Sequence, residues 1–192
     1  MRITKSDVIQ TAADIADKNG LSNVSLKAVA ESLNIRTPSL YNHIDSLEAL
    51  LREIAHNGMK TMNERMMQAA IGKIGDDAIK SVGITYLNYM IEHPGIYETI
   101  QWATWHGTEE TGKIFDNYLS LLKTLALSCN FNPVNIDEIL NLLTGVLHGY
   151  TTLQLRYAFT KPDEVRTALS TALDTVLAGL HQKYDQHEKG HL

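Results

Sequence analysis

The chain has 192 residues, of which 44% are apolar and 20% are charged. Chains of this size bury roughly 70% of their extended surface, so the composition predicts a globular protein with a substantial core. The opening segment is polar and amphipathic, and no apolar run reaches the roughly 18 residues expected of a membrane span. We therefore expect neither export nor membrane insertion.

The single cysteine bears on the cellular compartment, and the charge distribution bears on nucleic-acid binding. Cys129 has no second cysteine to pair with, and its neighbours Leu127 and Phe131 indicate a buried packing residue in a reducing cytoplasm. The formal net charge is -5, yet residues 1–60 carry seven basic and seven acidic side chains, against ten and fifteen in the remainder. Bulk charge thus argues mildly against nucleic-acid binding, and the placement of individual charges has to decide.

Apolar residues recur at intervals of three and four along the whole chain, which predicts an all-α fold of about nine helices. Thr4 is the expected cap of a first helix over 4–19, which Gly20 ends. Ser25 is expected to cap a short helix over 25–33 that stops at Asn34, a residue that tolerates left-handed backbone. Pro38 sits in the first turn of a further short helix over 37–43.

Six further helices are expected after residue 44. Asp45 or Ser46 caps a helix that runs toward residue 70, and a helix over 75–92 ends at the His93-Pro94-Gly95 break. A short helix around 96–102, a helix over 108–128 and two long helices over 135–159 and 163–184 complete the series. We expect a helix-turn-helix domain over 1–46, a helical ligand-sensing and dimerisation domain over 47–185, and a polar tail over 186–192.

Two short helices joined by a tight turn, behind a longer brace helix, have the spacing of a helix-turn-helix unit. In such units the second helix enters the major groove of DNA, and the first crosses the backbone and supplies phosphate contacts. In the second helix, Leu40 and Ile44 are expected to face inward. Pro38, Ser39, Asn42 and His43 then face outward, where short polar groups suit base edges.

The stretch Leu26-Lys27-Ala28-Val29-Ala30-Glu31-Ser32-Leu33-Asn34-Ile35, followed by Pro38-Ser39-Leu40-Tyr41-Asn42-His43-Ile44, resembles the head of TetR/AcrR-family regulators over about residues 4–55. The resemblance implies that Tyr41 and His43 contact phosphates and that Arg36 to Ser39 meet bases. Lys27, at the start of the helix that crosses the backbone, and Arg36 are also candidate phosphate contacts. Asn34 replaces the family's usual turn glycine, and Leu47 stands where the family often has a phosphate-contacting lysine. The expected DNA-binding residues are Ser25, Lys27, Arg36, Thr37, Pro38, Ser39, Tyr41, Asn42 and His43.

Trp105-His106-Gly107 resembles the signature of the WHG subgroup of TetR-type sensor domains. A ligand cavity among helices combines aromatic walls with a few polar groups. The candidate pocket residues are Tyr86, Met90, Trp102, Trp105, His106 and His148. Each could instead be a packing residue, and for His106 we favour a role in shaping the loop between two helices.

The last two helices carry broad apolar stripes that a symmetry mate could cover. The family resemblance implies a four-helix dimer contact at this place. It also implies a homodimeric repressor that binds a palindromic operator on double-stranded DNA and is released by a small-molecule effector. We expect no cofactor, no metal and no membrane partner.

Two other functions fit parts of the sequence. Glu53-x-x-His56 has the spacing of a di-iron ligand pair, and Glu188-x-x-His191 repeats it. The second copy, however, lies one residue from the last position, and a di-iron bundle also needs two further inward carboxylates. No metalloprotease, phosphate-loop or serine-elbow motif occurs. The other alternative is a small-molecule or protein-binding module whose head no longer binds DNA, although the outward polar residues of 36–43 are present.

Overall fold

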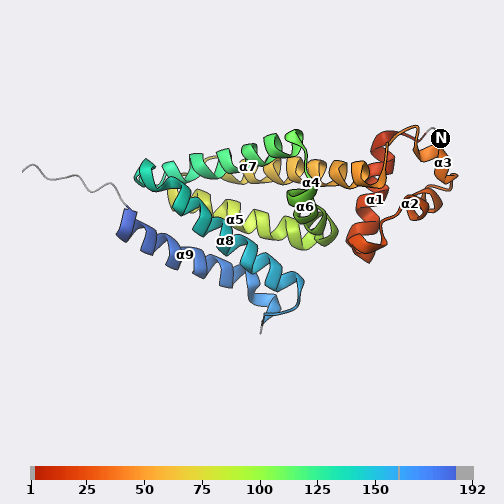
Figure 1. Cartoon of the computed structure of the whole chain (residues 1–192). Helices are drawn as coiled ribbons and strands as arrows, with labels where there is room; N and C mark the ends of the chain where they lie inside the picture. The colour runs from red at the N-terminus through yellow and green to blue at the C-terminus, as the bar shows by residue number, and fades with distance from the viewer. Residues whose placement is uncertain (1–2, 160, 185–192) are drawn as a thin grey trace, which may run out of the picture. The chain divides into compact units, whose positions relative to one another are not determined.

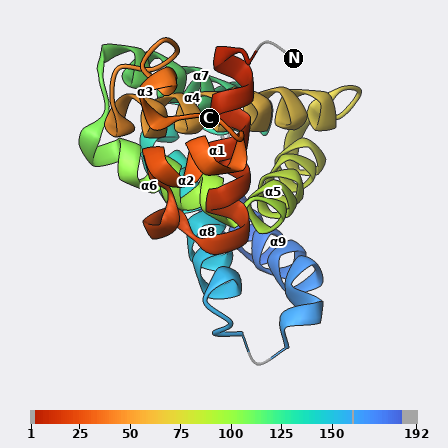
Figure 2. The same ribbon diagram turned by 90° about the vertical axis from the view of Figure 1, so that its right-hand side faces the viewer.

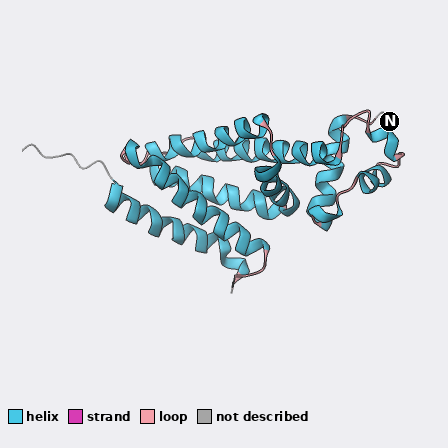
Figure 3. Cartoon of the chain, viewed as in Figure 1, coloured by secondary structure: helices cyan, strands magenta, loops and turns pink. Residues whose placement is uncertain are grey.

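The structure is a computed structural model that describes residues 3–159 and 161–184. Throughout this part of the chain the ordered elements are helices, and no β-strand occurs (Figure 3). The described helices are α1 (Lys5–Asn19), α2 (Leu26–Ser32), α3 (Thr37–Leu40), α4 (Leu47–Ala70), α5 (Gly75–Glu92), α6 (Pro94–His106), α7 (Glu109–Leu127), α8 (Ile136–Leu155) and α9 (Val165–Tyr184). The predicted all-α class is confirmed.

By its internal contacts the chain divides into two compact units. The first contains the residues up to Thr61 together with Glu92–Phe115, and the second contains Met62–Ile91 and the residues from Asp116 onward. Helix α6 belongs to the first unit because it packs against α1. The functional boundary expected after residue 46 stays a prediction. The polar tail expected over 186–192 lies outside the described residues.

The first unit begins with the helix expected at Thr4. The Thr4 side chain accepts a hydrogen bond from the backbone N–H of Asp7, and the Asp7 carboxylate accepts one from the backbone N–H of Thr4, which forms a capping box. Val8, Ala12 and Ala16 then recur on one face and are essentially fully buried. This brace helix packs against α2, which in turn packs against α3 (red to orange in Figure 2).

Helix α6 is longer than the short helix expected around 96–102. It starts at Pro94, immediately after the His93 break, and continues through Trp105 and His106. Proline fits this first position because its missing N–H would have no partner inside the helix. The Trp-His-Gly motif therefore forms the end of α6 rather than a separate loop.

In the second unit, α8 and α9 run side by side (Figures 1 and 2). Gly83 of α5 lies against both, since an added Cβ would come within 3.0 Å of side-chain atoms of Leu147 and Leu173. Helix α8 ends at Leu155, before the expected 159, because Tyr157 adopts a left-handed φ of 52°. The N–H of Ala158 then donates to the carbonyl of Leu153, which closes a Schellman motif.

None of the helices in the described ranges combines the length and the apolar character that a bilayer crossing requires.

Candidate nucleic-acid interface and sensor core

The turn between α2 and α3 has the geometry that a helix-turn-helix unit needs. Ser25 caps α2 by accepting a hydrogen bond of 3.1 Å from the N–H of Ala28. Asn34 is left-handed, with φ 53°, as its place in the sequence predicts. The N–H groups of Asn34 and Ile35 donate to the carbonyls of Glu31 and Ala30, so this turn is also a Schellman motif. Asn34 thus adopts the left-handed conformation for which glycine is the usual residue at a helix end.

Helix α3 is shorter than the expected 37–43. Its α-helical part ends at Leu40, and the N–H groups of Asn42 and His43 donate to carbonyls three residues earlier, as in a tighter 3-10 turn. Leu40 and Ile44 are buried, as predicted. Tyr41 is 57% exposed and is therefore not a core aromatic residue.

The nine residues expected to bind DNA all retain access to solvent. Lys27, Arg36, Pro38, Tyr41 and Asn42 are exposed, and Ser25, Thr37, Ser39 and His43 are half-buried.

Lys27 has a neighbouring charge on the same helix. Its Nζ lies 3.8 Å from Glu31 Oε1, and both side chains are largely exposed. Ion pairs of this kind are worth about 0–1 kcal/mol, so a phosphate group can compete with Glu31 for the ammonium at little cost.

Helix α6 is attached to α1 at its N-terminus by a residue that sequence reasoning missed, Asp17. One carboxylate oxygen of Asp17 accepts from the N–H groups of Gly95 (2.8 Å) and Ile96 (3.1 Å), and the other lies 2.8 Å from Nδ1 of His93. A carboxylate at this place satisfies helix donors that would otherwise be unpaired and complements the helix dipole. A Cβ on Gly95 would lie 2.1 Å from the backbone carbon of Ala16, so glycine is required.

The C-terminus of α6 is attached to α4. The guanidinium of Arg52 lies 3.4 Å from the carbonyl of His106 and donates to it, while His106 Nδ1 lies 2.9 Å from the carbonyl of Trp102. The rings of Trp102 and His106 stack at a centroid distance of 4.5 Å, and Trp105 is 86% exposed. Gly107 leaves no room for a Cβ beside the Ala103 carbonyl. These contacts place His106 in the last turn of α6, and its role in shaping the following loop stays a prediction.

The Glu53-x-x-His56 pair has separate partners. Glu53 forms an ion pair with Lys5, and Nε2 of His56 lies 2.7 Å from the hydroxyl of Thr111. Burial lowers the pKa of His56 below its ordinary value. Over residues 3–159 and 161–184, no group of three or more metal-ligating side chains comes together. The second pair, Glu188 and His191, lies outside the described residues.

The six pocket candidates fall into both compact units. Trp102, Trp105 and His106 belong to the first, whereas Tyr86, Met90 and His148 belong to the second. The structure brings Tyr86 and His148 together, with the Tyr86 hydroxyl 3.2 Å from Nδ1 of His148.

Tyr118 joins this pair, since its ring centroid lies 6.4 Å from that of Tyr86. Burial raises the pKa of Tyr118 to about 12, and burial lowers the pKa of His148. Tyr118 was missed because it lies on the apolar stripe of α7, where an aromatic residue reads as packing.

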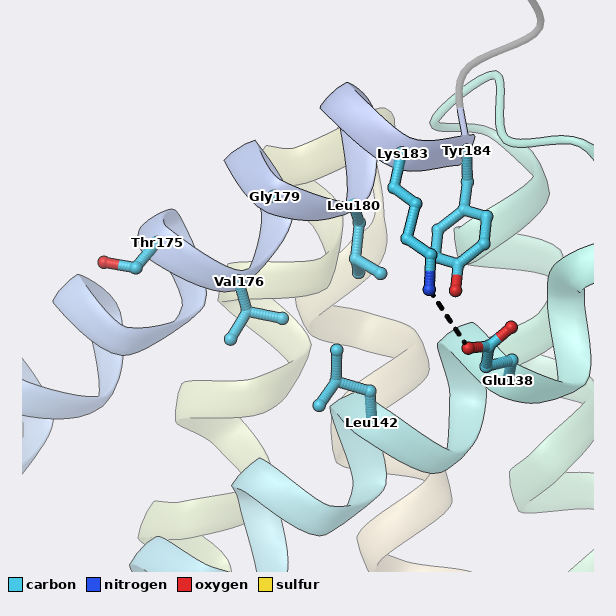
Figure 4. A pocket seen from close by; sticks show the side chains of 8 residues that line it. All are labelled: Glu138, Leu142, Thr175, Val176, Gly179, Leu180, Lys183 and Tyr184. Atoms are coloured by element: carbon cyan, nitrogen blue, oxygen red, sulfur yellow. Dashed lines mark hydrogen bonds and ion pairs between the residues drawn. The ribbon is translucent and has the colours of Figure 1, made fainter.

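The outer surface of α8 and α9 carries a groove of about 470 Å³ (Figure 4). Its lining residues are Glu138, Leu142, Thr175, Val176, Gly179, Leu180, Lys183 and Tyr184. An ion pair of 3.4 Å between Lys183 and Glu138 closes one end. Leu142 and Leu153 are exposed on α8, and nothing lies within 4 Å of a Cβ built on Gly145, Gly149 or Gly179. This face combines apolar side chains with room for close backbone approach.

Comparison with known proteins identifies the class. Residues 79–176 match the family described as tetracyclin repressor-like, C-terminal domain. The HTH-type transcriptional regulator YobS of Bacillus subtilis (strain 168) is 31% identical over 179 residues, which are 93% of this chain and 93% of that protein. The regulator Rv0681 of Mycobacterium tuberculosis is 29% identical over 96 residues, which are 50% of this chain and 44% of that protein.

Solved structures agree on the fold. A protein of unknown function from Rhodococcus sp. RHA1 superposes with a TM-score of 0.82 at 15% identity, covering 94% of this chain and 96% of that one. A TetR variant from Acinetobacter baumannii AYE, in complex with minocycline, superposes with a TM-score of 0.71 at 19% identity, covering 94% and 98%.

The chain belongs to the TetR family of transcriptional regulators, and the matched C-terminal domain is consistent with the WHG subgroup. Members of this family bind DNA operators and dimerise; they are regulators and not enzymes.

Proposed function

We propose that this regulator is a cytoplasmic, homodimeric repressor that binds a palindromic operator and is released by a small molecule. The observation that carries the proposal is the α2–turn–α3 unit, in which Leu40 and Ile44 are buried while Arg36, Tyr41 and Asn42 face solvent. In a dimer, the two α3 helices would enter successive major grooves about one helical turn apart.

The proposed DNA contacts divide into two kinds. Lys27, Arg36, Tyr41 and His43 contact phosphates, which gives affinity and a strong dependence on salt without sequence information. Base edges are read by Thr37, Pro38, Ser39 and Asn42, with Ser25 at the backbone. A few local phosphate contacts are sufficient to bind DNA even though the chain is acidic overall.

The proposed dimer contact is the outer face of α8 and α9. The exposed Leu142 and Leu153, together with the open surface around Gly145, Gly149 and Gly179, support a self-complementary interface between two copies of the chain. Apolar surface of this kind is costly to leave in water, and burying it contributes about 25 cal/mol for each Å².

We propose that the effector binds to the second unit and that α4 transmits the conformational change to the first. Helix α4 begins in the first unit and contributes its residues from Met62 onward to the second. A ligand that prefers a conformation in which the two DNA-binding units are displaced lowers the affinity for the operator. The operator lowers the affinity for the ligand by the same coupling free energy. The minocycline complex of the A. baumannii relative supports the small-molecule class of effector.

A helical binding module with an inactive head is the alternative function. The test is to select genomic DNA fragments with the purified protein and to measure binding of the enriched fragments across a salt series. The proposal expects a recurrent palindrome and an affinity that falls steeply with salt. If no fragment is enriched and weak binding ignores sequence, the head does not read DNA and the alternative replaces the proposal.

A further inference from the structure

The second unit contains buried polar atoms that make no hydrogen bond. Among the described residues, these include Oδ1 of Asn63, Oγ1 of Thr151 and Oε1 of Gln154. Thr151 is completely buried, with 0% of its surface exposed. Such atoms are rare in native proteins, and each calls for an explanation such as strain or a missing water or ligand.

Thr151 lies on a polar stripe along α8. Thr144, His148 and Thr151 are spaced by four and three residues, so they share one face of the helix. The Tyr86 hydroxyl of α5 lies against His148, and the Tyr118 hydroxyl of α7 lacks a well-formed hydrogen bond, with only Thr144 close enough to lower its pKa. We call Tyr86, Tyr118, Thr144, His148 and Thr151 the Tyr86 cluster.

The Tyr86 cluster carries no charge at neutral pH. Burial lowers the pKa of His148 below its ordinary value, so the imidazole is neutral. Burial is also the main cause that raises the pKa of Tyr118 to about 12. An ion placed here would lose its hydration and would gain no counter-charge from these five side chains, which costs several kcal/mol. Hydroxyls and a neutral imidazole can instead both donate to and accept from an uncharged ligand.

We propose that the Tyr86 cluster is the effector site and that the effector is an uncharged molecule with an apolar body and a hydrogen-bonding group such as an amide, ketone or alcohol. The inference rests on the proposed ligand-responsive function. Met90 lies one turn beyond Tyr86 on α5 and is buried. Its flexible side chain can adjust to the apolar part of a ligand.

The first experiment compares probes of matched shape and different charge. Benzamide and benzyl alcohol are the neutral probes, and benzoate and benzylammonium are the charged ones. Binding at millimolar concentration and pH 7.5 is followed by histidine-ring NMR. The neutral probes shift the His148 resonances, the charged probes do not, and His181, which pairs with Asp76 in the same unit, stays unchanged.

The second experiment removes one hydroxyl. Thr151→Val keeps the shape of the side chain and deletes a buried, unpartnered oxygen, so the melting temperature of the free protein rises. Affinity for benzamide falls by roughly tenfold, the equivalent of one hydrogen bond. Thr124→Val is the matched control, since its exposed hydroxyl only bonds the Ser120 carbonyl, and it leaves probe binding unchanged.

In Thr151→Val, a higher melting temperature together with a lower affinity for benzamide distinguishes a ligand-binding role of the hydroxyl from a structural one. If the hydroxyl had a purely structural role, its removal would lower the melting temperature and leave the affinity for the probes unchanged. Equal binding of benzoate, no His148 shift with any probe, or unchanged benzamide affinity in Thr151→Val overturns the inference. Fragment selection without probe tests the proposed repressor separately, so operator binding with no probe binding rejects the effector site alone.

Discussion

The two compact units treat their buried polar groups differently. In the first unit, His56 is paired with Thr111, the Asp17 carboxylate is shared by three partners, and the Thr99 hydroxyl donates to the Gly95 carbonyl over 2.6 Å. In the second unit, Thr151 and Gln154 retain polar atoms without hydrogen bonds. Fully satisfied networks favour one arrangement, whereas unsatisfied ones leave capacity for a ligand. The difference suits the DNA-binding role proposed for the first unit and the ligand-sensing role proposed for the second.

Among substitutions in the first unit, we expect Gly95→Ala to lower the free energy of unfolding the most. The added methyl group would collide with the backbone of Ala16, which cannot move aside as a flexible side chain can. We expect a loss of about 3 kcal/mol or more in the free energy of unfolding, measured by urea denaturation. Gly112→Ala in α7 is the control, because nothing lies within 4 Å of its added Cβ, and it should be neutral or stabilising. Equal stability of the two variants would contradict the close approach of α6 to α1.

A smaller loss is expected from Asp17→Ala. The substitution removes the acceptor for the N–H groups of Gly95 and Ile96, and loss of such a cap costs about 1–2 kcal/mol. Asp14→Ala, an exposed neighbour on α1 that bonds only Gln10 in the described structure, should change stability by less than about 0.5 kcal/mol. If thermal unfolding does not distinguish the two variants, Asp17 does not hold α6 to the brace helix.

The pH dependence of stability should be the smallest of these effects. His148 is neutral in the folded protein because burial lowers its pKa, and unfolding returns the pKa to about 6.5. Its contribution is therefore complete above pH 6.5 and is lost as the pH falls from 6.5 toward the folded-state pKa, by at most about 1.4 kcal/mol per pH unit. Denaturation at pH 7.5 and 5.5 should show a smaller decrease in His148→Gln than in the natural chain. An identical decrease would show that His148 is not buried as described.

Local chemistry predicted most of the fold. Thr4, Ser25 and Asn34 act at helix ends through hydrogen bonds to residues three positions away, so their roles can be predicted from the sequence. The predicted end of α8 at residue 159 is too late, because Tyr157 is neither glycine nor asparagine, the residues that usually mark a left-handed helix end.

The sites were less accessible to sequence reasoning because their contacts are distant along the chain. Asp17 meets Gly95 across 78 positions, and nothing near Asp17 indicates that partner. The pocket candidates were grouped by residue type alone, which could not separate Trp102 and His106 from Tyr86 and His148. Thr151 was missed because a buried threonine on a helix ordinarily bonds its own backbone.

The central claim is that the exposed face around α3 binds DNA, and Tyr41→Ala tests it most directly. Tyr41 is exposed, so its loss should leave dimerisation by sedimentation and the melting temperature unchanged. The affinity for an operator fragment selected with the natural chain should fall by roughly tenfold, corresponding to about 1.4 kcal/mol. An unchanged affinity for that fragment would contradict the placement of α3 in the major groove.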